Sequence, residues 1–366
     1  MKTIGIDARL YFQTGVGVYL RNLLHFLQRE PIPNIRFIVY VMEQDAHKIH
    51  FTSAQCTKRT VDAPWHSLAE QTRFLRDTYA DHLDLMHFTY FSYPVLYRRP
   101  FIATVHDVTP LFFKTGRAST KSSLVYEIKH MAFRFVISQQ VKQARHIITP
   151  TQAVKQQLLD YFGHSLENTV TAIHEGVNYE LMSARANTSI SKPFPQGFLL
   201  YIGNFYPHKN VEILLQAYHK LQNHSSNIPP LILVGPDNLF ATRLKKYVSI
   251  KQIKHIHFYH NSTREDLVYF YQHAHCLVHP TLSEGFGLPI VEAAHFGLPI
   301  VASDIPVFRE IVGDSFYPFD PRDTSSIAAQ LSRVLGERNL KKPLLVDDID
   351  FQLMTRETLK IYTSCV

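Results

Sequence analysis

The chain has 366 residues, of which 45% are hydrophobic, and this length allows two domains with cores of their own. Its formal net charge of +7 favours anionic partners such as nucleotides or acidic lipids. The basic residues are scattered and form no basic tail, which argues against a nucleic-acid-binding protein. The three cysteines have no metal-type spacing and cannot form an even disulfide framework, so a reducing cytosol is the simplest location.

The first half of the chain alternates short apolar runs with longer amphipathic ones, the pattern of a parallel sheet wrapped by helices. A first strand is predicted over 3–6 and a helix over 18–29, after the turn from Gly15 to Gly17. Further strands are predicted over 37–41, 85–88, 101–105, 146–149 and 170–173. Asp7 ends an apolar run too short for a signal peptide, and no eighteen apolar residues run together. We therefore expect a cytoplasmic protein without a membrane span.

The second half begins after 182–196, where a change to Ser, Ala, Asn, Pro and Lys predicts a linker. Strands are then predicted over 198–202, 231–234, 255–259, 276–279 and, as the last buried strand, 299–302. Helices are predicted over 211–222 and 265–273, from 288 onward, and over 351–362. We expect domains over 1–185 and 186–345, and a C-terminal helix in 346–366 that could cross back to the first domain. Ligands of open α/β sheets collect at the carboxyl ends of strands, so a cleft between the halves is the expected site.

The most informative stretch is EGFGLPIVE, from Glu284 to Glu292. Glycine and proline followed by helix-forming residues predict a loop that becomes a helix N-terminus near Leu288. Backbone N–H groups at such a terminus attract an anion, for example a diphosphate. The two glutamates therefore flank a turn suited to a nucleotide sugar, which has hydroxyls on both sides of its diphosphate.

Three other loops carry candidate residues. Lys209 follows the predicted strand 198–202, where its charge could neutralise a diphosphate, although alone it would be a solvated surface residue. His106 directly follows the strand 101–105 and either serves the site or, with Asp107, caps a turn. The glycine turn at 15–17 either approaches a phosphate or sugar or allows close packing, and without a third glycine it fits the dinucleotide fingerprint only in part.

Several pairs of residues mimic metal ligands without completing a site. His255 and His257 alternate on a predicted strand, and no carboxylate or cysteine is spaced to join them. Asp348 and Asp350 have the D-x-D spacing of metal-dependent sugar transferases, but they lie in a polar stretch near the C-terminus. We predict no metal site and no cofactor.

Two further segments leave alternatives open. The helical stretch 117–146 mixes apolar residues with six basic ones, so it is either a solvated surface helix pair or a face that rests on anionic lipid. Its basic residues are Lys121, Lys129, His130, Arg134, Lys142 and Arg145. The aromatic loop 88–94 either lines an acceptor site or packs in the core.

Together these segments resemble the retaining glycosyltransferases of family 4 over nearly the whole chain. The strongest block is 280–294, and weaker blocks are IGIDAR (4–9), VHDVTP (105–110), YIGNFYPHKN (201–210) and GLPIVAS (297–303). The resemblance implies a GT-B fold, an α/β architecture in which two Rossmann-like doubly wound domains face each other across a cleft. It also implies a metal-independent hexosyltransferase whose substrate is a GDP- or UDP-linked sugar.

The family further implies roles for the matching residues. In catalysis, His106 would reach the sugar, Lys209 would stabilise the leaving diphosphate, and Glu284 would bind sugar hydroxyls. The donor would also be held by Glu292 through the ribose, by Tyr259 and Asn261 near the base, and by Gly15, Gly17, Asn204, His208, Phe286, Gly287 and Leu288. Asn204 departs from the family, which usually has an arginine there, and His208 or Arg264 could supply the missing charge.

By resemblance to bacterial envelope mannosyltransferases, we expect transfer of mannose with retention to a glycan or lipid-linked acceptor. The process would be cell-envelope polysaccharide or lipopolysaccharide synthesis, at the inner face of the membrane. A catalytically degenerate nucleotide-sugar-binding protein is the alternative, because Asn204 brings no charge. A phosphorylase, which would need a pyridoxal phosphate lysine, or an epimerase of the same architecture is a third reading.

Overall fold

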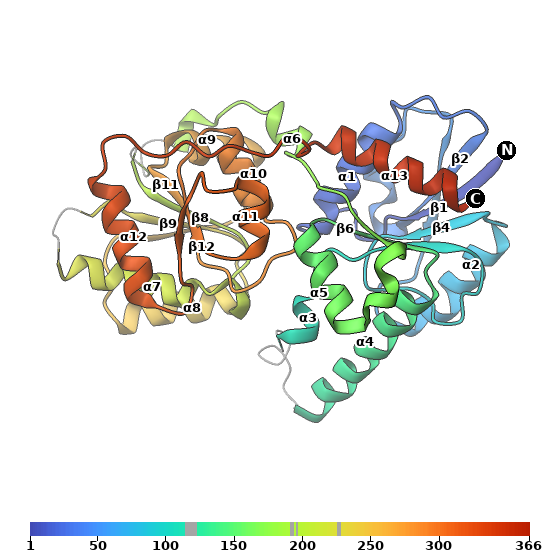
Figure 1. Ribbon diagram of the computed structural model, residues 1–366, viewed down its shortest axis with the longest axis horizontal. Coiled ribbons are helices and arrows are strands. Elements are labelled where there is room, and N and C mark those ends of the chain that lie inside the picture. Colours follow the sequence, from blue (N-terminus) through green and yellow to red (C-terminus); the bar gives the residue numbers. More distant parts are fainter. Residues whose placement is uncertain (114–122, 191–193, 195–196, 225–227) are drawn as a thin grey trace. The chain divides into compact units, whose positions relative to one another are not determined.

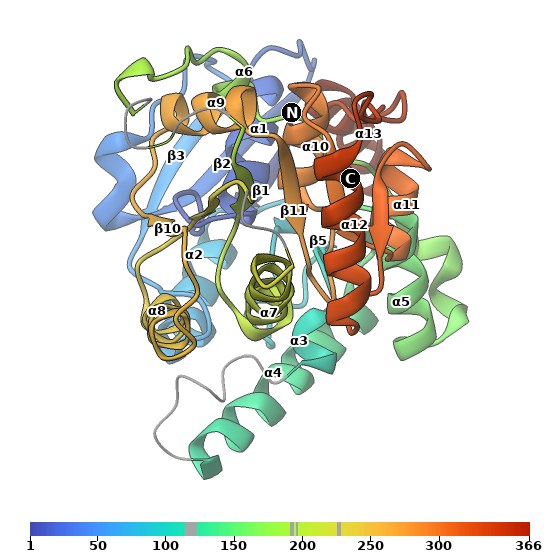
Figure 2. The ribbon, with the colours of Figure 1, turned by 90° about the vertical axis from the view of Figure 1, so that its left-hand side faces the viewer.

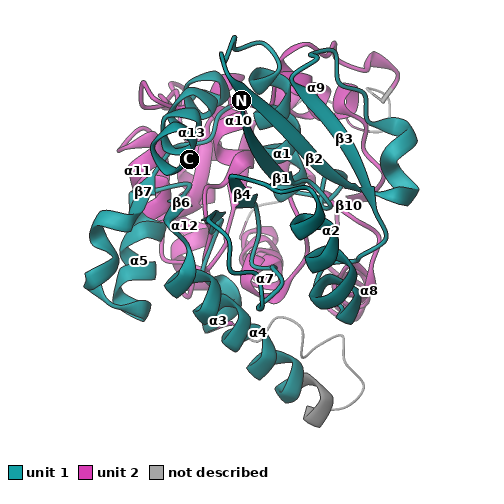
Figure 3. Ribbon diagram, turned by 90° about the vertical axis from the view of Figure 1, so that its right-hand side faces the viewer, with its two compact units in different colours: residues 1–112, 120–176, 350–366 teal, residues 113–119, 177–349 magenta. Residues whose placement is uncertain are grey.

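The computed structural model describes residues 1–113, 123–190, 194, 197–224 and 228–366. The chain divides into two compact units (Figure 3). Unit 1 comprises residues 1–112, 120–176 and 350–366, and unit 2 comprises 113–119 and 177–349. The start of the helical stretch predicted over 117–146, with Lys121, falls outside the described residues.

Unit 1 contains a seven-stranded parallel sheet in the order β3-β2-β1-β4-β5-β6-β7. Its strands are β1 (Lys2–Asp7), β2 (Ile35–Met42), β3 (Cys56–Val61), β4 (Leu85–Phe88), β5 (Phe101–Thr104), β6 (His146–Thr149) and β7 (Val170–Ala172). Its α-helices are α1 (Val16–Leu27), α2 (Leu75–Ala80), α3 (Thr109–Phe112), α4 (Ser123–Gln143), α5 (Gln152–Phe162) and α13 (Phe351–Cys365). A π-helical turn, η2 (Glu70–Phe74), precedes α2. The central strands β1 (apart from Lys2), β4 and β5 are buried and mostly apolar, as expected for a parallel sheet covered by helices.

Unit 2 contains a six-stranded parallel sheet in the order β10-β9-β8-β11-β12-β13. Its strands are β8 (Leu199–Ile202), β9 (Leu231–Val234), β10 (Ile256–Tyr259), β11 (Cys276–His279), β12 (Ile300–Ser303) and β13 (Tyr317–Phe319). Its α-helices are α6 (Tyr179–Met182), α7 (Val211–Gln222), α8 (Leu239–Ile250), α9 (Arg264–His273), α10 (Leu288–His295), α11 (Pro306–Val312) and α12 (Thr324–Gly336). Helices α7, α8 and α12 cover one face of the sheet and α9, α10 and α11 the other (Figures 1 and 2). The doubly wound α/β architecture predicted for both halves is therefore confirmed.

Two edge strands differ from the sequence-based expectations. The expectation that 299–302 is the last buried strand is wrong, because β13 continues the sheet beyond it. β13 has three residues with Pro318 at its centre, and proline is tolerated there because an edge strand leaves one side of its backbone unpaired. β3 has no sequence prediction at all, since four of its six residues are exposed and polar. β3 is thus too polar, and β13 too short and interrupted by proline, for the apolar pattern on which the expectations rest.

Helix α13 belongs to unit 1 although unit 2 precedes it in the chain (Figure 3). Its Tyr362 is fully buried and its hydroxyl lies 2.7 Å from Nδ1 of His87 in β4. The helix begins in close contact with the loop after β7, where a Cβ at Gly176 would lie 2.3 Å from the backbone N of Phe351. Only glycine permits this approach, so Gly176 sets where the chain returns to unit 1.

The aromatic loop 88–94 contributes mainly to the core of unit 1. Phe88, Phe91 and Tyr93 are at most 1% exposed and pack with other buried aromatic rings. Within the described residues, no helix has the length and apolar character that crossing a membrane requires.

Candidate active site

The candidate site of unit 2 lies where the order of the strands in its sheet reverses. β8 and β11 are neighbours at the centre of the sheet, and the helices that follow them, α7 and α10, cover opposite faces. Such a switch point, at the carboxyl ends of the strands, is the usual ligand position in open α/β sheets. The loops after β8 and β11 are bonded to each other, because the N–H of Leu282 donates to the carbonyl of His208 at 2.7 Å and the Asn210 amide donates to the carbonyl of Pro280 at 3.1 Å.

Glu284 binds two cationic or hydrogen-donating side chains at this point. Its Oε1 accepts from Nζ of Lys209 at 2.6 Å and from Nε2 of His279 at 2.8 Å. Only 9% of the Glu284 side chain and 1% of the His279 side chain are exposed. Burial alone would raise the pKa of Glu284, but the Lys209 charge and the His279 hydrogen bond outweigh it and hold that pKa well below its ordinary value. Glu284 is therefore ionised, and within the described chain its Oε2 has no bonded partner.

The helix that follows Glu284 begins as the sequence predicts. Gly287 adopts φ +89°, a left-handed conformation that favours glycine, and Leu288 and Pro289 form the first turn of α10. A Cβ at Gly287 would lie 2.7 Å from the ring of Phe308, so packing also requires a glycine there. The first amides of a helix have no intrahelical acceptor, which makes this terminus suitable for an anion.

Glu292 lies inside α10, away from the Lys209 contact. It is 8% exposed, and its Oε2 accepts a hydrogen bond of 2.6 Å from the hydroxyl of Tyr271 in α9. Burial raises the pKa of Glu292 to about 7, against the hydrogen bond from Tyr271, which lowers it. The two glutamates of the motif thus have opposite electrostatic environments: one is ionised by its partners, and the other titrates near neutral pH.

The residues around Lys209 show which groups can supply positive charge. Burial, reinforced by the Lys209 charge, lowers the pKa of His208 to about 4, so His208 is neutral at pH 7. Arg264 is paired with Glu180 at 2.6 Å. Asn204 accepts a hydrogen bond of 2.6 Å from the Tyr201 hydroxyl through its backbone carbonyl. Lys209 is therefore the cation of this loop, and neither alternative considered for the missing arginine brings a second charge to it.

Tyr259 is the last residue of β10 and Asn261 lies just after it, at the edge of the sheet and two strands from β8. The Tyr259 hydroxyl donates to Asp266 at 3.0 Å, and Asn261 has φ +56°. The structure therefore groups Lys209, His208 and Glu284 tightly and leaves Tyr259, Asn261 and Glu292 as separate contacts of unit 2.

His106, Gly15 and Gly17 belong to unit 1. Nε2 of His106 lies 3.0 Å from the carbonyl of Thr89, and its Nδ1 lies 3.3 Å from Oε1 of Glu175, which is 4% exposed. Tyr19 packs edge-on against the His106 ring at 4.8 Å. Both ring nitrogens face oxygen acceptors, so the imidazole is held in one orientation.

The glycine turn is explained by backbone conformation at Gly15 and by packing at Gly17. Gly15 has φ +70°, and a Cβ at Gly17 would lie 2.6 Å from the backbone oxygen of Tyr11. This requirement accounts for both glycines whether or not a ligand approaches them.

Four partners of the candidate residues were missed by sequence reasoning: Thr89, Glu175, Tyr271 and His279. Glu175 and His279 each lie at or near the end of a strand, and position at the carboxyl edge of the sheet is the signal that could have found them. Nothing in the sequence marks Tyr271, which pairs with Glu292 only through the packing of α9 on α10.

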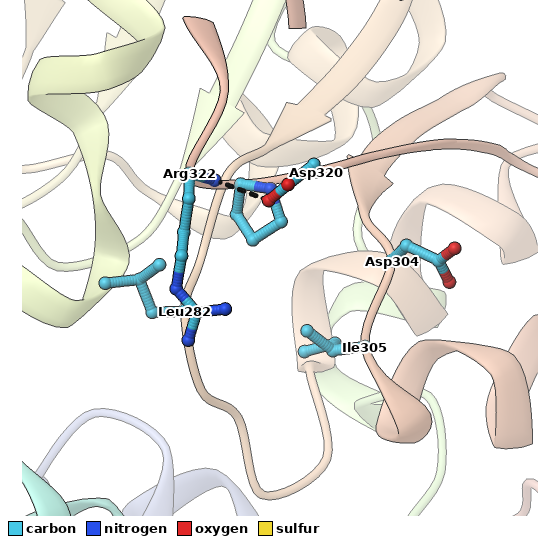
Figure 4. Close-up of a pocket in the computed structure, with 6 residues that line it drawn as sticks. Leu282, Asp304, Ile305, Asp320 and Arg322 are labelled. Carbon is cyan, nitrogen blue, oxygen red and sulfur yellow. Dashed lines mark hydrogen bonds between the residues drawn. The ribbon is translucent and has the colours of Figure 1, made fainter. Parts of the chain in front are cut away.

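A cavity of about 290 Å³ opens at the same edge of the unit 2 sheet, beyond β12 and β13. It is lined by Leu282, Asp304, Ile305, Asp320, Pro321 and Arg322 (Figure 4). Asp304 is already paired with Arg309 at 2.8 Å. No group of three potential metal ligands occurs among residues 1–113 and 123–366 as far as they are described.

Two family models match the chain: one described as Glycosyltransferase Family 4 matches residues 14–181, and one described as Glycosyl transferases group 1 matches 186–344. The chain belongs to the group 1 glycosyltransferases of family 4. The group 1 match includes all residues of the candidate site in unit 2.

Two curated relatives are similar to this chain. O-antigen chain mannosyltransferase RfbU of Salmonella typhimurium is 27% identical over 232 residues, which are 63% of this chain and 60% of the relative. O-antigen chain mannosyltransferase B of Escherichia coli is 29% identical over 244 residues, which are 64% and 61% of the two chains. The match thus spans about three fifths of the length of these relatives.

Solved structures show the fold. Sucrose-phosphate synthase from Thermosynechococcus elongatus has a TM-score of 0.77 at 17% identity and covers 100% of this chain and 99% of that one. Anabaena HepE in complex with UDP-glucose has a TM-score of 0.73 at 16% identity, with 100% of both chains covered. The chain therefore has a GT-B fold, as predicted.

The buried pair of Lys209 and Glu284 predicts a specific stability pattern. Lys209→Met should leave Glu284 as a buried carboxylate with one partner and lower the free energy of unfolding by roughly 3 kcal/mol. The double variant Lys209→Met/Glu284→Gln should recover most of that loss, because no unpaired charge remains. Calorimetric melting of the variants measures both effects. Arg73→Met, which breaks a pair whose side chains are 57% and 64% exposed, is the control and should change stability by at most about 0.5 kcal/mol. A Lys209→Met protein as stable as the wild type would contradict the bridge.

The raised pKa of Glu292 predicts that the stability of the fold depends on pH. Its folded-state pKa exceeds the unfolded one, so stability falls as pH rises from about 4.5 to 7 and then levels off. Glu292→Gln removes this loss, and its melting temperature relative to the wild type should be higher at pH 8 than at pH 5, by the equivalent of roughly 3 kcal/mol. Tyr271→Phe should move the transition to higher pH, because it removes the hydrogen bond that lowers the pKa. Tyr269→Phe, in the same helix, should not move it. A pH-independent difference between Glu292→Gln and the wild type would refute the shift.

Proposed function

We propose that this glycosyltransferase moves a hexose, mannose as the first choice, from a nucleotide diphosphate sugar to a hydroxyl of a glycan or lipid-linked acceptor. The observation that carries the proposal is the buried Glu284, held by Lys209 and His279 beside the N-terminus of α10. The O-antigen mannosyltransferases among its relatives support mannose and cell-envelope polysaccharide or lipopolysaccharide synthesis. A structure of the same fold contains UDP-glucose, which supports a UDP-linked sugar as the second candidate donor.

In the proposed reaction, the diphosphate lies against the first amides of α10 and the ammonium of Lys209. Lys209 is 17% exposed, so an incoming phosphate can reach it and compete with Glu284 for its charge. Both bonds to Glu284 are made by Oε1, which leaves Oε2 to accept a hydroxyl of the transferred sugar. As the bond from the anomeric carbon to the phosphate breaks, Lys209 and the helix terminus stabilise the departing charge.

Glu292 would accept the ribose hydroxyls, and His106 would contact the sugar from unit 1. Glu175 and Thr89 hold His106 in one orientation, which would limit the rotamers lost on binding. The proposed transfer proceeds with retention at the anomeric carbon, by front-side attack of the acceptor hydroxyl with the leaving phosphate as the base, and the resemblance to family 4 supports this choice. This mechanism assigns no step to a metal ion.

Donor binding and turnover test the proposal together. A panel of nucleotide sugars should include one, GDP-mannose first, that stabilises the chain, and at 100 times its dissociation constant the gain is about 2.7 kcal/mol. Lys209→Ala should lower turnover by about one to three decades. Glu284→Gln should impair transfer more than binding of free GDP, and Glu292→Gln the reverse. Donor binding without turnover for any acceptor would favour the degenerate binding protein, and unchanged turnover and affinity in Lys209→Ala would remove Lys209 from the mechanism.

We also propose that α4 rests on anionic lipid, which would bring the chain to a lipid-linked acceptor. Ile128, Met131 and Phe135 are 54–63% exposed and lie on one side of the helix, next to Lys129 and Arg134. In Figure 1 the first part of α4 extends away from the sheet of unit 1. An apolar stripe flanked by cations is typical of a helix that lies in a membrane interface.

Vesicle sedimentation tests this contact. Binding to phosphatidylglycerol vesicles should exceed binding to phosphatidylcholine vesicles and should weaken with salt. Ile128→Ser/Phe135→Ser should lower vesicle binding at least tenfold, since burial of each large side chain contributes about 1.5–3 kcal/mol. Ile250→Ser, at an equally exposed position in α8, is the control. Equal vesicle binding by both variants would exclude α4 as the contact.

A further inference from the structure

The single tryptophan of the chain lies at the surface of unit 1 beside two other rings. Trp65 is 40% exposed, and its ring centroid lies 5.0 Å from that of His66 and 6.0 Å from that of Tyr90. His66 and Tyr90 stack on each other at 6.1 Å with an interplanar angle of 30°. We call Trp65, His66 and Tyr90 the aromatic platform. A core role does not explain it, because the indole and the imidazole both face solvent.

The platform is built from two loops at one edge of the sheet. Trp65 and His66 follow β3, and Tyr90 follows β4, so both loops leave the carboxyl ends of parallel strands. This is the edge where open α/β sheets bind ligands. The platform therefore lies at the functional edge of unit 1.

Hydrogen bonds fix the two loops against each other. Nε2 of His66 lies 3.2 Å from the carbonyl of Phe91, and the His66 N–H donates to Oγ of Ser92 at 3.2 Å. Ser92 in turn donates to Glu70, which is 1% exposed and paired with Arg9. The rings are thus positioned before any ligand arrives, which reduces the conformational entropy lost on binding.

The same segment holds His106. The carbonyl of Thr89, which lies 3.0 Å from Nε2 of His106, immediately precedes Tyr90. The carbonyl of Tyr90 accepts from the Gln140 amide at 2.9 Å, so this backbone is fixed on both sides. A molecule bound on the platform would therefore have a defined position relative to the imidazole that the proposed mechanism places at the sugar.

The chemistry of the platform matches a sugar ring. One face of a hexopyranose presents C–H bonds, which pack on the negative face of an aromatic ring, while its hydroxyls need hydrogen-bond partners at the rim. The carbonyl of Phe91 is an acceptor, so Nε2 of a neutral His66 carries the proton and Nδ1 is left to accept from a hydroxyl. We propose that the aromatic platform binds a hexopyranose unit of the acceptor glycan. This inference rests on the proposed function, transfer to a glycan, and adds where the acceptor is recognised.

Trp65 is also the reporter that tests the proposal, because its fluorescence is the only tryptophan signal of the chain. Full-length protein with saturating GDP is titrated with α-linked mannotriose and, separately, maltotriose. At least one trisaccharide should produce a saturable change in emission. Tyr90→Leu should raise the concentration for half-saturation roughly five- to twentyfold, the size expected for loss of one aromatic contact.

Kinetics give a second readout that does not depend on fluorescence. With GDP-mannose as donor and the trisaccharide as acceptor, Trp65→Leu should raise the acceptor KM roughly five- to twentyfold while leaving the dissociation constant for GDP unchanged. Trp65→Phe, which keeps an aromatic face, should recover most of the loss. Leu68→Ala changes a side chain in the same loop that is 85% exposed, and it should leave both values as in the wild type.

Three outcomes overturn the proposal. One is the absence of any emission change with either trisaccharide while GDP still stabilises the chain, which leaves the proposed function intact. A second is a blue shift of Trp65 with phosphatidylglycerol vesicles and none with sugars, which would make the platform a lipid contact. The third is an equal rise in acceptor KM for Trp65→Leu and Leu68→Ala, which would point to a disturbed loop. If the wild type bound neither GDP nor UDP, the proposed function itself would be refuted.

Discussion

The carboxylate of Glu284 depends on two partners, and the candidate site of unit 2 depends on that carboxylate. A charge so far removed from water is costly unless it is paired, and here Lys209 and His279 share one of its oxygens. The contact joins the loop after β8 to the end of β11 and the loop that follows it, so it also fixes these two loops against each other. Both partners bind Oε1. The carboxylate is therefore ionised and fixed in position, while its Oε2 can still accept a hydrogen bond from a ligand. The same pair of side chains thus serves stability in the free protein and, in the proposed mechanism, recognition in the bound one.

Unit 1 uses a comparable arrangement at its own carboxyl edge. Arg9 is 4% exposed and binds both Asp7 and Glu70 at 2.7 Å, while Ser92 donates to Glu70. These contacts order the end of β1, the π-helical turn η2 and the loop after β4 together. His106 and the aromatic platform are both attached to that loop. In each unit, buried ionic contacts therefore lie beneath the strand ends and leave the side chains above them rigid, as a preorganised site requires.

The sequence predicts the regular strands, helices and turns of this molecule and misses the features that depend on tertiary packing. The turn at 284–288 is readable because its glycines and proline have local conformational causes, and Gly287 does adopt the left-handed conformation. The central strands can be predicted because they are mostly apolar and short. The edge strands β3 and β13 cannot, since β3 is mostly polar and β13 has only three residues with a proline at its centre. The roles of Lys209 and Glu284 could be inferred from family resemblance, but their mutual bond, and the opposite titration of Glu284 and Glu292, follow from His279 and Tyr271. Those two partners come from other elements, and no local pattern announces them.

The position of α13 affects the order in which the two units can fold during synthesis. Unit 1 is built mostly from the first 176 residues, yet residues 350–366 complete it, and Tyr362 is buried against its central strand β4. On the ribosome, all of unit 2 emerges before that helix. Unit 2 can therefore complete its fold first. Unit 1 would still expose the apolar residues that α13 covers, which reverses the usual N-to-C order of domain folding. Chaperones that protect nascent chains would have most to do on the half that was made first.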